Sequence, residues 1–292
     1  MDDFVERAWR LVLRREPDPG SAERVERGEV SCARLVRELV ESREFERLEA
    51  LDDGLALARR HRGERPRELR APAWSDERAV ELPWVLARYA GERRVLDVGT
   101  AFAEPLYVAG LQELGAQELV TVDLAEPATV VADVRELPFE DGSFDLVLCV
   151  STLEHVGRDN AVYEIEAPRE EAGDEAALRE LRRVLARHGR LIVSVPTGVR
   201  DDQGWQLQRE PEDWIRSFEA AGFLVYEDEL YVHTDEGWRS ASLDEARTAR
   251  YGESHAGAVL LAELHPGTLG GKLRLAVRDV RYRDDIRRST VS

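Results

Sequence analysis

The stretch over residues 93–104 constrains the fold more than any other part of the chain. It begins with an apolar run at 95–98, which suits a strand buried on both faces of a parallel sheet. Gly99 follows at once, and from Leu106 onward the apolar residues have helical spacing. The order strand, tight turn, helix predicts an open α/β sheet. In such sheets ligands bind in the crevice at the carboxyl ends of the strands.

Residues 97–103 read Asp-Val-Gly-Thr-Ala-Phe-Ala and resemble the first motif of class I S-adenosylmethionine (SAM)-dependent methyltransferases, acid-x-Gly-x-Gly-x-Gly. Alanine replaces the second and third glycines, and the first, Gly99, is kept where the backbone must turn sharply. The resemblance implies that Asp97, Gly99, Thr100 and Ala101 bind the cofactor SAM. It also implies a doubly wound, seven-stranded Rossmann-like methyltransferase sheet.

Two further acids follow predicted strands in the same part of the chain. Asp123 ends the second strand about two dozen residues after Gly99, a spacing typical of a ribose-binding carboxylate. The resemblance implies that Asp123 and Leu124 bind SAM, that Asp133 meets the adenine amino group and that the Val134 amide meets a ring nitrogen. The alternatives are a helix N-cap or loop acid for Asp123 and a turn aspartate for Asp133.

The most specific resemblance lies between residues 137 and 156. Leu-Pro-Phe at 137–139, Asp-Gly-Ser-Phe-Asp at 141–145 and Ser-Thr-Leu-Glu-His-Val at 151–156 are very typical of small-molecule methyltransferases. The resemblance implies that backbone groups of Val150 and Ser151 lie beside the methionine part of SAM.

His155 is the candidate catalytic residue. It directly follows the fourth strand, and a histidine can remove a proton from a hydroxyl or carboxyl acceptor near neutral pH. Lining the pocket or capping a helix are the alternatives. By position alone, Tyr163, Trp205, His233 and Trp238 are further candidates for the substrate pocket, and each could equally be a packing residue.

The rest of the sheet is predicted from apolar runs. A fifth strand is expected at 190–196, a sixth at 224–232 and a seventh at 258–264, the last two as an antiparallel edge pair. We expect His233 and Trp238 in the connection between the sixth and seventh strands. Ser75 is placed to cap the helix before the first strand.

The chain divides into four predicted parts. Residues 1–51 read as a small all-α domain, 52–74 as a charged linker, 75–267 as the methyltransferase domain and 268–292 as a C-terminal extension. The first part resembles a bacterial helical domain of unknown function that is appended to enzymes of surface-polysaccharide clusters. Its helices are expected to recognise substrate, to pair with a second copy of the chain or another protein, or simply to pack.

Composition limits the partners. The net charge of −18 opposes binding to nucleic acid, and we expect none. Cys32 and Cys149 are too few for a disulfide framework or a cysteine zinc site, so we expect no metal. No signal-peptide core and no apolar run of about 20 residues is seen, so we expect a soluble cytoplasmic protein without a membrane span.

We therefore interpret the chain as an enzyme that transfers a methyl group from SAM to a small-molecule acceptor. The narrower hypothesis is O-methylation of a sugar in surface-polysaccharide or secondary metabolism. Two alternatives stay open: a non-catalytic scaffold that binds a partner protein, suggested by Ala101 and Ala103, and an oxidoreductase that uses a nicotinamide dinucleotide. The missing glycines and the stretch around Asp133 count against the oxidoreductase.

Overall fold

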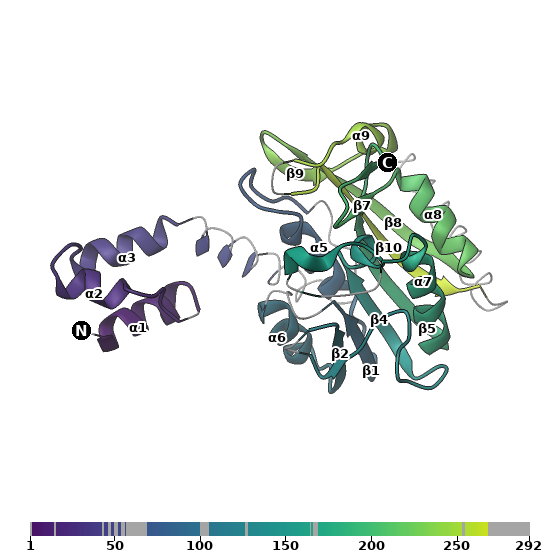
Figure 1. The fold of residues 1–292 in the computed structure, drawn as a ribbon, viewed down its shortest axis with the longest axis horizontal. Helices are drawn as coiled ribbons and strands as arrows, with labels where there is room; N and C mark the ends of the chain where they lie inside the picture. The colour runs from purple at the N-terminus through teal and green to yellow at the C-terminus, as the bar shows by residue number, and fades with distance from the viewer. Residues whose placement is uncertain are drawn as a thin grey trace, which may run out of the picture.

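The main sheet orders its strands β3-β2-β1-β4-β5-β10-β8-β9, which is eight strands within the described residues (Figure 1). The computed structural model describes residues 2–14, 16–42, 44–45, 48–49, 52–53, 56, 69–99, 105–125, 128–163, 165, 169–252 and 255–267. The predicted cofactor residues Thr100 and Ala101 and the predicted C-terminal extension at 268–292 lie outside these ranges.

The strands follow the predicted order along the chain. They are β1 (Arg94–Val98), β2 (Glu118–Asp123), β3 (Val130–Val131), β4 (Phe144–Val150), β5 (Leu185–Pro196), β8 (Phe223–Thr234), β9 (Gly237–Ser240) and β10 (Ala258–Pro266). β1 pairs in parallel with β2 and β4, β4 pairs in parallel with β5, and β10 runs antiparallel to both β5 and β8. The predicted doubly wound sheet is confirmed.

The predicted number of seven strands is one too few. Residues 237–240 form the edge strand β9, which pairs antiparallel with β8 and places Trp238 opposite His233. These two residues therefore lie in paired strands, and their predicted place in a connection was wrong. A separate two-stranded ribbon joins β6 (Asp201–Asp202) to β7 (Leu207–Gln208).

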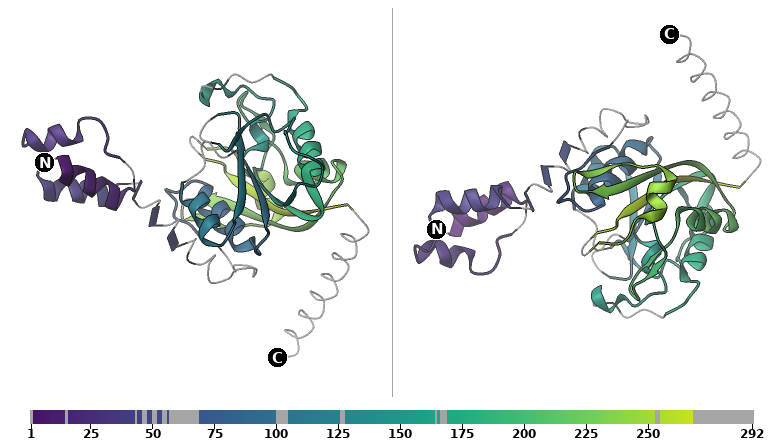
Figure 2. Two further views of the ribbon diagram at one scale, coloured as in Figure 1. Left: turned by 90° about the horizontal axis from the view of Figure 1, so that it is seen from below. Right: turned by 90° about the horizontal axis from the view of Figure 1, so that it is seen from above.

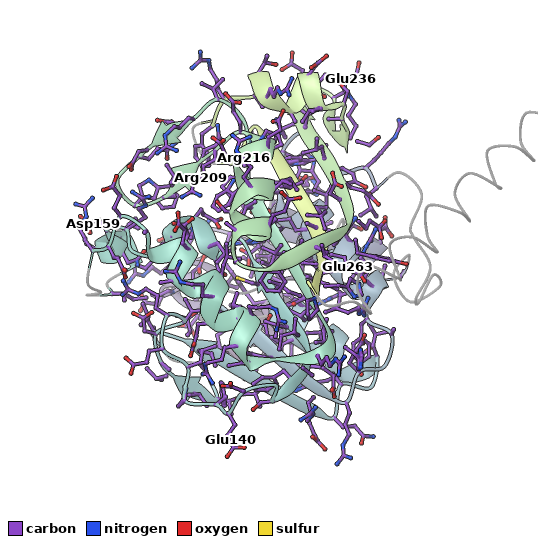
Figure 3. All side chains as sticks on the ribbon, turned by 90° about the vertical axis from the view of Figure 1, so that its right-hand side faces the viewer. Glu140, Asp159, Arg209, Arg216, Glu236 and Glu263 are labelled. Atoms are coloured by element: carbon purple, nitrogen blue, oxygen red, sulfur yellow. The ribbon has the colours of Figure 1, made fainter. Side chains whose placement is uncertain are left out.

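Each face of the sheet carries its own hydrophobic core, because neighbouring residues of a buried strand point to opposite sides. Val95 packs in one cluster with Trp84 and Leu111, whereas the next residue, Leu96, packs in the other with Leu178 and Trp214. Helices cover both sides of the sheet (Figure 2). Charged side chains such as Glu140 and Glu236 point outward from the surface (Figure 3).

Helices α5 and α6 supply the first of these cores, and α7 and α8 supply the second. The described helices of this part are α5 (Arg78–Arg88), α6 (Pro105–Glu113), η1 (Leu153–His155), η2 (Asn160–Tyr163), α7 (Gly173–Val184), α8 (Pro211–Ala220) and α9 (Leu243–Thr248). α7 ends at Val184, so β5 begins earlier than the predicted fifth strand. Helix α5 crosses near β4 and brings its first turn to the carboxyl end of that strand, as the hydrogen bond from Ser151 to Glu81 shows.

Residues 69–74, the end of the predicted linker at 52–74, pack against the sheet. Leu69 and Ala71 are buried, and Ala71 exchanges two backbone hydrogen bonds with Trp238 of β9. Ser75 does not cap α5. Its hydroxyl donates to the Pro72 carbonyl at 2.6 Å, and the helix begins with Glu77 at its N-cap.

The N-terminal helices α1 (Asp2–Val12), α2 (Ser21–Glu26) and α3 (Cys32–Val40) enclose a third hydrophobic cluster. Trp9 and Leu35 lie in this cluster, which shares no residue with the two cores of the sheet. Figure 1 shows these helices beside the sheet, not as a layer on either face. Among the residues that the structure describes, no helix is both long and apolar enough to cross a membrane.

Candidate active site

A pocket opens at the carboxyl ends of β1, β2 and β4, where an open α/β sheet binds its ligands. Its empty volume is about 810 Å³ including the mouth, which is within the range of small-molecule sites. Its walls come from five segments of the chain. They are lined by Arg78, Val98, Gly99, Val122, Asp123, Leu124, Ala132, Asp133, Val134, Arg135, Ser151, Thr152, His155, Val156, Gly157, Asn160, Tyr163 and Ile165.

Gly99 forms the floor of this pocket and needs to be glycine for two reasons. Its φ of 87° lies in the left-handed region, and a Cβ there would stand 2.1 Å from the Thr152 Oγ1 atom. Thr152 is held in place because its hydroxyl donates to the Val150 carbonyl at 2.9 Å. The turn after β1 therefore lies directly against the end of β4.

Asp97 lies behind the pocket and is not one of its lining residues. Its carboxylate is buried and accepts a hydrogen bond of 3.0 Å from the Tyr107 hydroxyl of α6. Burial, together with the Asp97 charge, raises the pKa of Tyr107, so that the tyrosine stays a donor. In the described structure Asp97 holds β1 to α6.

Asp123 and Leu124 line the pocket where β2 ends, as the ribose hypothesis requires. The Asp123 Oδ1 atom accepts a hydrogen bond from the Ala125 amide at 3.2 Å. This contact closes the turn after the strand and fixes the carboxylate at the pocket wall.

Asp133 and Val134 also line the pocket, but Asp133 has a partner that was not predicted. Arg135 binds its carboxylate at 2.6 Å and also contacts Glu170 at 2.9 Å. Burial raises the pKa of Asp133, yet the hydrogen bonds from Arg135 lower it by more, so it stays ionised. An adenine amino group at this wall would meet a carboxylate that is already paired.

The backbone at Val150 and Ser151 is largely engaged within the protein. Ser151 lines the pocket, but its amide donates to the Ser194 carbonyl and hydroxyl at 3.1 and 3.0 Å. The Val150 carbonyl accepts from Thr152, and Val150 is not a lining residue. The Ser151 hydroxyl donates to Glu81 of α5 at 2.7 Å, so this position connects the pocket to the helix above it.

Sequence reasoning missed a group of charged and titratable side chains at this end of β4, near the start of α5. Arg78 lines the pocket and binds Glu81 at 2.7 Å, and Glu77 lies close enough to Glu154 to raise the pKa of Glu154. Burial, reinforced by Glu81, raises the pKa of Glu77 to about 7. Burial raises the pKa of Glu154 to about 8. The signal in the sequence was an acid, Glu81, within an apolar helical run.

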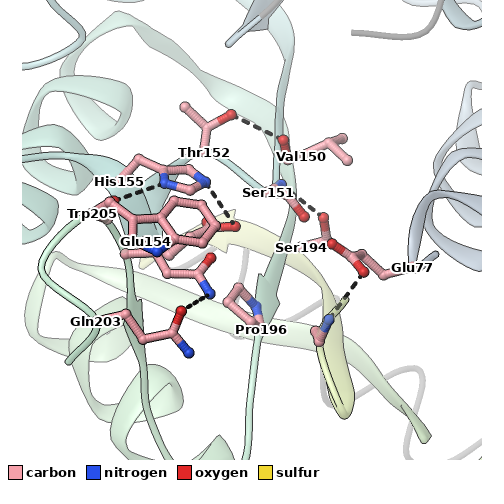
Figure 4. A network of polar contacts seen from close by, with 12 residues as sticks. Glu77, Val150, Ser151, Thr152, Glu154, His155, Ser194, Pro196, Gln203 and Trp205 are labelled. Atoms are coloured by element: carbon pink, nitrogen blue, oxygen red, sulfur yellow. Dashed lines mark hydrogen bonds and ion pairs between the residues drawn. The ribbon is translucent and has the colours of Figure 1, made fainter. Parts of the chain in front are cut away.

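His155 lies at the pocket wall in η1, as the catalytic hypothesis requires. Its Nδ1 atom is 3.0 Å from the Trp205 carbonyl, which fixes Nδ1 as the donor and leaves Nε2 to accept a proton (Figure 4). Burial lowers the pKa of His155 to about 4, so the imidazole is neutral near pH 7.

Aromatic rings surround His155 and extend the wall of the pocket. Trp205 stacks on the imidazole with ring centroids 5.3 Å apart, and Tyr163 meets it edge-on at 5.4 Å. Of the four substrate-pocket candidates, Tyr163 lines the pocket and Trp205 packs against its wall. His233 and Trp238 contact each other between β8 and β9 and do not line it.

No metal centre is evident in the described part of the chain, where no group of three or more His, Cys, Asp or Glu side chains could hold an ion. The fit to SAM is better supported. Gly99 lines the pocket, and two pocket-lining acids stand at the end of β2 and just after β3. Ionised carboxylates accept hydrogen bonds, so these acids can receive the hydroxyl and amino hydrogens of a nucleoside.

Comparisons with known proteins agree with this geometry. Residues 96–193 match the family described as a methyltransferase domain. An uncharacterized protein of Methanocaldococcus jannaschii is 32% identical over 108 residues, which are 35% of this chain and 40% of that protein. The chain thus spans less than half the length of this relative.

Solved structures give more distant matches. A Burkholderia thailandensis 1,6-didemethyltoxoflavin N1-methyltransferase, solved with S-adenosylhomocysteine, is 16% identical with a TM-score of 0.44, covering 63% of this chain and 76% of that one. The [4+2]-cyclase SpnF is 17% identical with a TM-score of 0.46, covering 78% and 97%. Residues 96–193 are thus similar to a methyltransferase domain, and the confirmed strand order agrees with this similarity.

Proposed function

We propose that this protein transfers the methyl group of SAM to a small-molecule acceptor. The observation that carries the proposal is the pocket at the strand ends, with Gly99 as its floor and Asp123 and Asp133 in its walls. Asp123 would accept hydrogen bonds from the ribose hydroxyls, and Val134 would border the adenine. When bound, SAM supplies a methyl group that is already activated for attack.

The protein's own residues then have a positioning task. The reaction needs the acceptor atom in line behind the methyl group and water kept away. Tyr163 and Trp205 form an apolar wall beside His155, and this wall would hold the acceptor and exclude water. The neutral Nε2 atom of His155 would take the proton that the acceptor loses.

The acceptor that we favour is a sugar hydroxyl, in surface-polysaccharide or secondary metabolism. A hydroxyl loses a proton on methylation, and the unprotonated Nε2 atom of His155 supplies a group to receive it. Aromatic rings such as Trp205 and Tyr163 also suit the apolar faces of a small ring compound. The compartment that we propose for this reaction is the cytoplasm.

Titration calorimetry with SAM and, separately, with a nicotinamide dinucleotide tests the cofactor. We expect SAM to bind and the dinucleotide not to bind. The Asp123→Ala variant should bind SAM about 1.5–3 kcal/mol more weakly, the value of hydrogen bonds to a charged group. Asp235→Ala, which removes an exposed acid at the far β8–β9 turn, is the matched control and should bind normally. Unchanged affinity in folded Asp123→Ala would refute the ribose assignment.

A scaffold function is the second candidate, and one observation favours it. The N-terminal helices expose large apolar side chains, with Phe4 38%, Leu11 81% and Val40 42% accessible. Such residues suit contact with a second copy of the chain or a partner protein. If neither SAM nor the dinucleotide binds, and the protein self-associates through these helices, this function replaces methyl transfer.

A further inference from the structure

Two buried glutamates lie beside histidines in this fold, and their surroundings differ. Glu263 on β10 is 2.8 Å from His265 and 3.1 Å from Arg190, so two donors satisfy its carboxylate. These contacts lower its pKa in spite of the burial, which acts in the opposite direction. Glu263 is therefore an ionised structural residue.

Glu154 is equally buried but is not satisfied. It is 3% exposed, and its Oε2 atom has no hydrogen-bond partner among the described residues. Its Oε1 atom is 3.8 Å from the Nε2 atom of His155, close but too long for a direct hydrogen bond (Figure 4). A buried carboxyl with an unpaired oxygen is costly, so native structures hold one mainly where it has a task.

Other charged and titratable groups face Glu154 from several elements. They are Glu77 at the N-cap of α5, Arg78 and Glu81 within α5, Cys149 of β4, Tyr163 of η2, Tyr251 in the loop before β10, and His155 of its own turn. The carboxylates of α5 oppose its ionisation, and Arg78 favours it. Burial is the largest effect, and it favours the neutral acid.

The two neighbours are thus pushed in opposite directions. The pKa of Glu154 rises to about 8, whereas the pKa of His155 falls to about 4. Between about pH 4 and pH 8, Glu154 is therefore protonated and the imidazole of His155 is neutral. Adjacent groups whose pKa values are driven apart are characteristic of acid–base sites.

We propose that Glu154 is the positioning partner of His155 and receives, through Nε2, the proton that the methyl acceptor loses. This inference rests on the proposed methyl transfer and names the residue that completes its proton path. With Nδ1 bound to the Trp205 carbonyl, Nε2 is the ring nitrogen that faces Glu154 and remains free to accept. Glu154 must be ionised before the reaction for the transfer to be favourable.

The step balances with these groups alone. The O–H bond of the acceptor breaks, its electron pair forms the new bond to the methyl carbon, and the carbon–sulfur bond breaks with its pair left on sulfur. The proton first passes to Nε2; the imidazolium then turns toward Glu154, and the same proton moves from Nε2 to the Glu154 carboxylate, which leaves the imidazole neutral again. Release to solvent after product departure restores the starting state.

The first experiment needs neither cofactor nor acceptor. In protein labelled with ¹⁵N at its six histidines, His155→Gln identifies the His155 signals, which are then followed between pH 4 and 10. We expect the His155 imidazole to stay neutral, with its proton on Nδ1, down to about pH 4, where its ¹⁵N shifts change as it gains a second proton. A second step in these shifts should occur near pH 8, as Glu154 ionises. Glu154→Gln keeps the shape and should remove only the step near pH 8.

Two control variants separate this result from a general electrostatic effect. Glu77→Gln should displace the step near pH 8 but not abolish it, because it changes a neighbour of Glu154. Glu263→Gln, the same change in the other buried pair, should alter the His265 signals and leave His155 unchanged. A step near pH 8 that persists in Glu154→Gln, or an Nδ1 atom without its proton, would overturn the proposal.

The second experiment follows the reaction once a screen has found an acceptor. The rate should rise as pH passes about 8, and Glu154→Gln should lose that rise, with kcat lowered on the order of 10²-fold and KM little changed. Glu154→Asp, which keeps the carboxyl, should retain the rise, and it replaces Glu154→Gln if that variant does not fold. A rate in Glu154→Gln that equals the wild type at pH 9 would refute the proton path. SAM titration separates the two proposals, since the methyl-transfer proposal fails if SAM does not bind, whatever the histidine signals show.

Discussion

Replacing Gly99 with alanine tests the geometry of the pocket floor most directly. Two separate penalties should follow. An alanine at a φ of 87° is in the left-handed region, which costs about 1–2 kcal/mol. Its Cβ would also stand 2.1 Å from Thr152 Oγ1, so the threonine must turn away from the carbonyl of Val150.

The magnitude of the second penalty can be worked from the same contacts. Loss of a hydrogen bond costs about 0.5–1.5 kcal/mol, and a side chain forced from its rotamer costs a similar amount. Gly222 has the same φ of 87° and no atom within 4 Å of an added Cβ, so Gly222→Ala carries the backbone penalty alone. We expect Gly99→Ala to lose about 1–3 kcal/mol more unfolding free energy than Gly222→Ala.

Guanidinium denaturation of four proteins measures this difference. These four are the wild type, Gly99→Ala, Thr152→Ala and the double variant, and a fifth protein, Gly222→Ala, is the control. If the clash is the cause, the double variant should be more stable than the sum of the single changes predicts, by at least about 1 kcal/mol. Additive changes, or a Gly99→Ala loss no greater than that of Gly222→Ala, would refute the close approach of the β1 turn to Thr152.

Three further predictions concern the acids, the histidine and the N-terminal helices. Because the pKa of Glu154 is raised in the folded state, the protein loses stability as pH rises from about 4.5 to 8. Thermal or denaturant unfolding should show that Glu154→Gln is as stable as the wild type at pH 4 and more stable by roughly 4–5 kcal/mol at pH 9. If the stability of Glu154→Gln fell with pH as steeply as that of the wild type, the prediction would be wrong. His155→Ala should lower turnover 10²–10⁴-fold with SAM affinity little changed if Nε2 takes the proton, whereas a changed acceptor KM with normal kcat would mean that His155 only lines the pocket. A chain beginning at Glu68 should fold and bind SAM. A chain beginning at Ser75 should unfold more easily, because it lacks Leu69 and the Ala71–Trp238 hydrogen bonds. If circular dichroism showed the Glu68 chain to be molten, the N-terminal helices would belong to the same folding unit as the sheet.

The sequence predicted those parts of the fold that local patterns specify. The apolar run at 95–98 and the glycine after it identify a buried strand and its turn without any knowledge of neighbours. The same holds for β2 and Asp123, since an acid at a strand end reaches the ligand crevice in any parallel sheet. The edge strand β9 was missed because it is short, Gly237–Ser240, and has no apolar run; it pairs with the neighbouring β8 and makes one further bridge to Ala71.

The chemical environment of the site could not be predicted in the same way. Whether the Ser151 amide is free depends on Ser194 of β5, and whether Asp133 is paired depends on the turn that brings Arg135 back to it. The importance of Glu154 appears only when α5 brings Glu77, Arg78 and Glu81 to the end of β4. Apart from the Asp133–Arg135 pair, these are contacts between residues distant in sequence, and hydrophobic periodicity carries no information about any of them.

The contrast between Glu154 and Glu263 explains why one buried acid is tied down and the other is not. A carboxylate that only stabilises the fold gains from every donor it can find, and Glu263 has both Arg190 and His265. A carboxylate that must accept a proton during a reaction gains nothing from such donors, because each would lower its pKa and weaken it as an acceptor. Arg78 does lie nearby, but its direct ion pair is with Glu81. Arg78, the cation that could have neutralised Glu154, is thus paired with Glu81. Glu154 can therefore titrate near pH 8, where the imidazole of His155 is neutral.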